Sequence, residues 1–123
     1  MPDQTPTVVL VHGAFAESAS WNDVVDRLLA RGIDVVAAAN PLRSVTGDAA
    51  YVRDVIASLD RPVVLVGHSY GGMVVTEAAA DNDAVVGLVY VAAFAPEHGE
   101  SALQLSTMFP GSTLGDALAA YPV

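Results

Sequence analysis

The sequence contains no cysteine and few basic residues, and these two absences exclude several classes of function. Without cysteine, the chain has no disulfide, no thiolate ligand for a metal ion and no thiol nucleophile. Only 5 lysine and arginine residues stand against 14 acidic residues, which gives a net charge of −9. Nucleic acids and anionic membranes bind basic patches, so we expect neither to be a partner.

Charged residues of both signs are scarce, at 15% of the chain, while apolar residues make up 53%. A typical soluble domain has about 25% charged residues and has much surface to cover, so further polypeptide is expected to cover part of this one. The longest apolar run, residues 84–95, is shorter than the ~20 residues that a membrane helix needs. No basic segment precedes the first apolar run, so the N-terminus does not resemble a secretory signal and we expect a cytoplasmic protein.

Four β-branched runs alternate with segments of helical apolar spacing. The runs are Thr7–His12, Asp34–Ala39, Pro62–Gly67 and Val85–Phe94. They are continuously apolar, which is typical of parallel strands covered on both faces. The segments between them predict helices over residues 18–31, 48–59 and 70–80. This alternation predicts an α/β fold: a parallel, doubly wound sheet of about four strands in the order 2-1-3-4, with helices on both faces.

The segment from Gly67 to Gly71, GHSYG, matches the pattern G-x-S-x-G and lies between a predicted strand and a predicted helix. This context is that of a nucleophile elbow, a sharp turn that raises a serine hydroxyl above the carboxyl edge of a sheet. The two glycines leave room for the turn. Ser69 also lies at a helix N-terminus, which favours negative charge, so the Tyr70 N–H can face a developing oxyanion.

A second motif, VVLVHGAF, spans Val8 to Phe15. A predicted strand ends there in His12 and Gly13, and the following N–H groups, of Ala14 and Phe15, face the same sheet edge. Acyl transfer needs two N–H donors on one oxygen. This loop can supply the second donor, because the first and third strands of the chain are neighbours in a doubly wound sheet.

These motifs, together with Trp21 and the segments LVGHSYGGMV and VYVAAFAPEHGES, resemble the α/β-hydrolase superfamily. Within it, the chain is similar to small-ester hydrolases and hydroxynitrile-lyase-like members. The resemblance covers the N-terminal part of the family fold, without its last strands. It implies a core over residues 1–96 and the start of a cap, or lid, over residues 97–123.

The resemblance also implies roles for individual residues. Ser69 would be the nucleophile, and the N–H groups of Ala14 and Tyr70 would form the oxyanion hole, with Phe15 as an alternative to Ala14. The family order is nucleophile, acid, histidine. Only His98 follows Ser69, and it could approach from the active-site edge, although its position does not match a catalytic position of the family.

We therefore expect a serine hydrolase that acts on a small carboxylic ester, present as a truncated piece that is weakly active or inactive alone. Three alternatives stay open: a minimal esterase completed by dimerisation or by His98, a non-catalytic scaffold or assembly module, and a hydroxynitrile-lyase-type activity in the parent protein. No metal or organic cofactor is implied, because the sequence has no metal-ligand spacing and no dinucleotide or P-loop glycine pattern. The unpaired edge of the Val85–Phe94 strand predicts self-association, or pairing with the missing C-terminal part.

Overall fold

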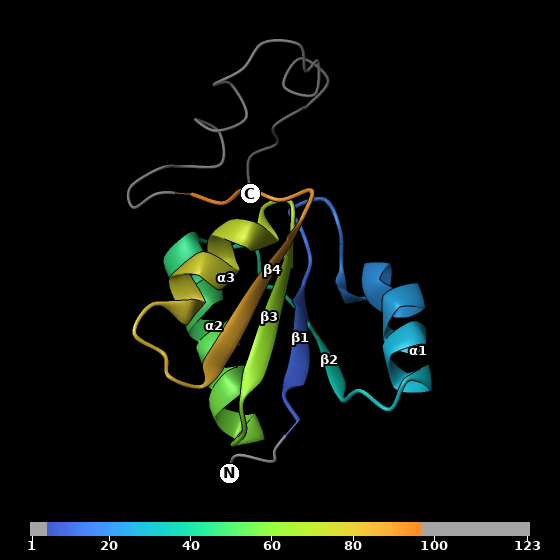
Figure 1. Cartoon of the computed structure of the whole chain (residues 1–123). Coiled ribbons are helices and arrows are strands. Elements are labelled where there is room, and N and C mark those ends of the chain that lie inside the picture. Colours follow the sequence, from blue (N-terminus) through green and yellow to red (C-terminus); the bar gives the residue numbers. More distant parts are fainter. Residues whose placement is uncertain (1–4, 97–123) are drawn as a thin grey trace.

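The computed structural model describes residues 5–96, which form one parallel sheet with helices on both faces (Figure 1). The strand order is β2-β1-β3-β4. The strands are β1 (Thr7–Val11), β2 (Val35–Ala38), β3 (Val63–His68) and β4 (Val85–Val91). One face carries the 3₁₀ turn η1 (Ser18–Trp21) and α1 (Asn22–Ala30), and the other carries α2 (Val45–Leu59) and α3 (Gly71–Ala79). The predicted α/β class, parallel sheet and strand order are confirmed.

The strand order determines where a site can form. β1 pairs in parallel with both β2 and β3, so that Val9 lies between Val36 and Leu65. The chain leaves β1 towards α1 on one face and leaves β3 towards α3 on the opposite face (Figure 1). The loops after β1 and β3 therefore diverge at the carboxyl edge, which is where doubly wound sheets bind their ligands.

The core lies between the sheet and the two helices α2 and α3. Its fully buried side chains come from three strands and both helices: Val9, Val11, Ala38, Val63, Leu65, Val52, Ile56, Val74, Val75 and Ala78. Burial of one side chain such as Leu65 contributes about 1.5–3 kcal/mol. This layer therefore holds α2, α3 and the central strands together as a unit, and it fixes the elements that carry the site.

Two helix boundaries differ from those that the sequence predicted. Helix α2 begins at Val45 rather than at residue 48, because the Ser44 hydroxyl accepts a hydrogen bond from the Gly47 N–H at 2.9 Å. Such an N-cap contributes about 1 kcal/mol and extends the helix by one turn. The first predicted helix is divided into the 3₁₀ turn η1 and helix α1, which meet at Trp21.

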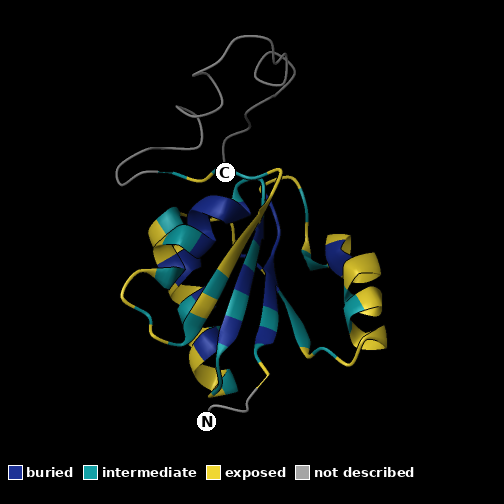
Figure 2. Cartoon of the chain, viewed as in Figure 1, coloured by how far each residue is buried: buried dark blue, intermediate teal, exposed yellow. Residues whose placement is uncertain are grey.

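The prediction that every strand is covered on both faces is wrong for β4. The exposed fractions of Val86, Val89 and Val91 are 58%, 45% and 43%, and Figure 2 shows β4 and α1 largely as exposed. Within residues 5–96, β4 is an edge strand, and α1 packs against β2 at the far side of the sheet. The apolar stripe of α1 is also open, since Leu29 is 55% exposed.

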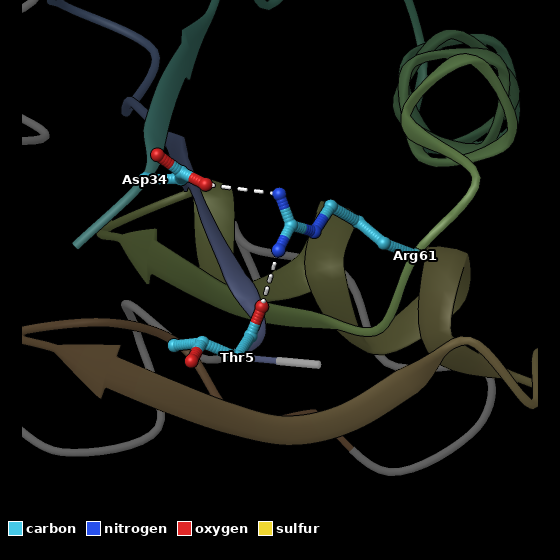
Figure 3. Close-up of polar contacts among 3 residues, drawn as sticks. All are labelled: Thr5, Asp34 and Arg61. Atoms are coloured by element: carbon cyan, nitrogen blue, oxygen red, sulfur yellow. Dashed lines mark hydrogen bonds and ion pairs between the residues drawn. The ribbon is translucent and has the colours of Figure 1, made fainter. Parts of the chain in front are cut away.

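Arg61 joins three chain segments at the amino edge of the sheet (Figure 3). Its guanidinium donates to the Asp34 carboxylate and to the Thr5 carbonyl oxygen, both at 2.9 Å. Each of these residues lies just before a strand, so the contacts align the starts of β1, β2 and β3. Because the Asp34 side chain is 68% exposed, the ion pair itself contributes about 0–1 kcal/mol.

Candidate active site

Ser69 lies directly after β3 in a left-handed backbone conformation, with a φ of 54°. A residue with a side chain is strained in that region by about 1–3 kcal/mol. Three backbone hydrogen bonds hold the turn. The Ser69 N–H donates to the Val91 carbonyl at 3.4 Å, and the Ser69 carbonyl accepts from Gly72 at 3.0 Å and from Phe94 at 3.2 Å. The end of β4 and the first turn of α3 thus support the strained serine.

Glycines beside Ser69 allow two backbone segments to pass very close to each other. A Cβ on Gly67 would lie 2.7 Å from the carbonyl carbon of Gly71, and a Cβ on Gly71 would overlap the carbonyl oxygen of Val11. Atoms of the main chain cannot rotate away as a side chain can. The expectation that these two glycines leave room for the turn is confirmed.

The loop after β1 lies against Ser69. A Cβ built on Gly13 would be 3.0 Å from the Ser69 Cβ and 3.5 Å from the Ser69 Oγ. The next residue, Ala14, lines a cavity of about 370 Å³ that Tyr70 also lines. Among the hydrogen bonds of residues 5–96, the N–H groups of Ala14, Phe15 and Tyr70 have no acceptor. The structure thus brings Ala14 and Tyr70 to the lining of one cavity and leaves their N–H groups without an acceptor among the described residues; that they bind an oxyanion stays a prediction.

The His12 side chain is held in this loop by hydrogen bonds at both of its ring nitrogens. Its side chain is buried, its Nε2 accepts the Asn40 N–H at 3.0 Å, and its Nδ1 donates to the Gly13 carbonyl at 2.9 Å. The Asn40 side chain also donates to the His12 carbonyl at 3.1 Å. With both ring nitrogens in use, His12 orders the turn and has no lone pair left for the Ser69 proton.

The His68 ring lies on the α1 face of the sheet. It packs edge-on against Trp21, with ring centroids 6.2 Å apart, and lines a cavity of about 180 Å³ there. His98 lies outside the described residues. In the part of the chain that the structure describes, the Ser69 hydroxyl makes no hydrogen bond to a histidine side chain.

Asp48 belongs to the site, although sequence reasoning used it only to mark a helix start. Its carboxylate is fully buried, accepting the Tyr70 hydroxyl at 2.8 Å and the Arg43 N–H at 3.0 Å. Burial, together with the hydrogen bond and the charge of Asp48, raises the pKa of the Tyr70 phenol, which therefore stays a donor. A signal was available: Asp48 lies on one helical face with Val52 and Ile56, where a carboxylate is out of place.

Other features of the described residues add no second site of this kind. Among residues 5–96, no three His, Asp or Glu side chains are grouped so that they could hold a metal ion. None of the helices there is both long and apolar enough to cross a membrane. A cavity of about 380 Å³ beside Arg61, Asn82 and Val86 lies at the amino edge of the sheet, on the opposite side from Ser69.

Residues 8–122 match the Alpha/beta hydrolase family, and the chain belongs to this family. The chain is similar to a carbendazim-hydrolyzing esterase of Nocardioides sp. (strain SG-4G). The two are 37% identical over 114 residues, which cover 79% of this chain and 46% of the esterase. The family predicted from the elbow and the loop after β1 is therefore confirmed.

Solved structures of the same family share the fold. An extracellular α/β-hydrolase from a Paenibacillus species superimposes with a TM-score of 0.77 and 26% identity, covering 91% of this chain and 49% of that one. A pyrethroid hydrolase from Sphingobium faniae JZ-2 gives a TM-score of 0.74 and 26% identity, covering 89% and 47%. The chain thus spans about half the length of the relatives that it matches.

Proposed function

We propose that the chain carries the nucleophile of a serine hydrolase that acts on small carboxylic esters. The observation that carries this proposal is the strained, left-handed Ser69, packed against Gly13 at the carboxyl edge of the sheet. Ser69 attacks the carbonyl carbon of the ester. The N–H groups of Ala14 and Tyr70 donate to the resulting oxyanion, with Phe15 as the alternative to Ala14. The similarity to an esterase supports an ester as the substrate class.

The attack also needs a base that accepts the Ser69 proton. Because His12 and His68 are held in other contacts, we assign the base to His98 or to a histidine of further polypeptide. Removing the base from such a site leaves about 10³–10⁴-fold catalysis over water. The 123-residue chain alone is accordingly proposed to be weakly active or inactive. The cap over residues 97–123 lies outside the described residues and, like the cytoplasmic location, stays a prediction.

A fluorophosphonate tests the assignment of Ser69 without requiring turnover. We expect it to label Ser69 in the folded chain at least about 100-fold faster than in the urea-unfolded chain, because an oxyanion donor contributes about 10²–10³. Mass spectrometry of proteolytic fragments measures the rates, with the exposed Ser58 as internal control. Equal rates at Ser69 and Ser58 would contradict the proposal and favour the non-catalytic scaffold.

The variant His98→Ala locates the base in the same labelling experiment. A large drop in the Ser69 rate would assign the base to His98. An unchanged rate would assign it to further polypeptide, because the described residues contain no other candidate histidine.

We propose in addition that the open edge of β4 pairs with a strand from a further part of the protein or from a second copy. Two observations support this. β4 is an edge within the described residues, and its side chains Val86, Val89 and Val91 are exposed although they are apolar. An unpaired apolar edge presents free N–H and C=O groups to another strand and promotes association.

The variant Val89→Lys is expected to weaken self-association of the isolated chain about tenfold, since lysine on an edge strand opposes pairing. Sedimentation velocity over a range of concentrations measures the change. Leu29→Lys is the matched control: Leu29 is 55% exposed on α1, and its substitution adds the same charge away from β4. If both variants associate as the unmodified chain does, the contact does not involve the β4 edge.

A further inference from the structure

A buried carboxylate anchors the residue that follows the nucleophile. Asp48 lies in the first turn of α2, 22 residues before Tyr70 in the sequence, and accepts the Tyr70 hydroxyl. The other oxygen of the same carboxylate accepts the Arg43 N–H from the segment over residues 40–44, here named the β2–α2 loop. Asp48 therefore links the Tyr70 side chain to this loop.

The opposite end of the β2–α2 loop is linked to the other oxyanion donor. Asn40 binds the ring of His12 through its backbone N–H and the carbonyl of His12 through its side chain. The His12 ring in turn holds the Gly13 carbonyl, directly before Ala14. One loop is thus joined by hydrogen bonds to both segments that carry the free N–H groups, and it lines the cavity between them.

Stability alone gives little reason for an aspartate at this place. Its carboxylate is fully buried, and no Lys, Arg or His side chain of residues 5–96 forms an ion pair with it. Taking a charge out of water is costly, and two hydrogen bonds together with the position of Asp48 in the first turn of α2 offset that cost only in part. An apolar side chain on the same helical face, as at Val52, would be buried at lower cost. We therefore explain the presence of a carboxylate here by the two groups that it binds, the Tyr70 hydroxyl and the Arg43 N–H.

We propose that Asp48 is a positioning residue for the oxyanion hole. By fixing the far end of the Tyr70 side chain, it fixes the direction of the Tyr70 backbone N–H, and through the β2–α2 loop it fixes the spacing between that N–H and the N–H of Ala14. This inference rests on the proposed role of Ser69 as a nucleophile.

The geometry explains why such an anchor is needed. Tyr70 is the residue before α3, and its N–H has no acceptor among the described residues. The conformation of the turn rests on Ser69 in a strained region. Since a misplacement of about 1 Å at a reacting centre costs about 10²-fold in rate, a tether on the adjacent side chain preserves catalysis.

The variant Asp48→Ala is expected to lower the maximal rate of Ser69 labelling by a fluorophosphonate about tenfold, while the concentration for half-maximal rate stays unchanged. Asp48→Asn is expected to restore part of the rate, because the amide oxygen can still accept the Tyr70 hydroxyl, whereas the amide NH2 group cannot accept the Arg43 N–H. Tyr70→Phe removes the same hydrogen bond, leaves the carboxylate in place and should lower the rate as Asp48→Ala does. Circular dichroism confirms that each variant is folded at the temperature used.

The matched control is Val52→Ala, one turn further along the same buried face of α2. It removes packing without touching Tyr70 and should keep the labelling rate of the unmodified chain. If Asp48→Ala and Tyr70→Phe label as fast as Val52→Ala, the positioning role is overturned and the role of Ser69 stands. If the unmodified chain shows no selective labelling of Ser69, both proposals fail.

Discussion

Replacing Gly71 with alanine is expected to leave the chain unable to fold. The new Cβ would overlap the carbonyl oxygen of Val11 and would lie 3.0 Å from the carbonyl oxygen of His12. Both oxygens belong to the main chain, so neither can rotate away, and α3 would have to move off β1. That movement would expose Val74 and Val75, which are fully buried, at about 1.5–3 kcal/mol for each side chain.

Urea unfolding followed by circular dichroism measures this effect. Natural domains have only about 5–15 kcal/mol of stability, and we expect Gly71→Ala to lose more than about 4 kcal/mol and to show little or no cooperative transition. The control is Gly87→Ala in β4, where the same chemical change would meet only the two Val64 methyl groups, at 3.6 and 3.7 Å. Its free energy of unfolding should stay within about 1 kcal/mol of the unmodified chain. Equal stability of the two variants would contradict the close approach of α3 to β1.

Replacing Gly13 with alanine is expected to slow the labelling of Ser69 about 100-fold while the chain stays folded. The added Cβ would lie 3.0 Å from the Ser69 Cβ and 3.2 Å from the His68 carbonyl oxygen, which is tight but leaves room for a small shift. The loop can move because Ala14 and Phe15 are exposed. Moving the Ala14 N–H away from its position would remove one of the two proposed oxyanion donors, and the loss of such a donor costs about 10²–10³ in rate.

The comparison uses labelling rates of two variants whose circular dichroism matches that of the unmodified chain. Glu17→Gln serves as control, because Glu17 is exposed in the same loop and its side chain makes no capping hydrogen bond. We expect Glu17→Gln to label as fast as the unmodified chain. If Gly13→Ala did so too, the loop after β1 would take no part in stabilising the oxyanion.

The sequence by itself determined the elements, their order and the family, and it led to the prediction that Ser69 is the nucleophile. Continuous β-branched runs and helical apolar spacing are local patterns, so they identify β1 to β4 and the helices between them without knowledge of distant contacts. The elbow at Ser69 is local as well, because strand, turn and helix follow one another within ten residues, Val63 to Gly72. The strand order β2-β1-β3-β4 agrees with the doubly wound pattern that the alternation of strands and helices predicted.

Only the tertiary structure decided which side chains lie around Ser69 and Tyr70, and that the faces of β4 and the apolar stripe of α1 are left exposed. Asp48 reaches Tyr70 across 22 residues, and Asn40 reaches His12 across 28, so neither pair has a signature in a local pattern. The spacing of apolar residues shows which face of a helix or strand is apolar, but it does not show whether another element packs on that face. The sequence of β4 is as apolar as that of β3, and β4 is nevertheless exposed. The burial of a strand depends on strand pairing and helix packing, which are contacts between distant segments of the chain.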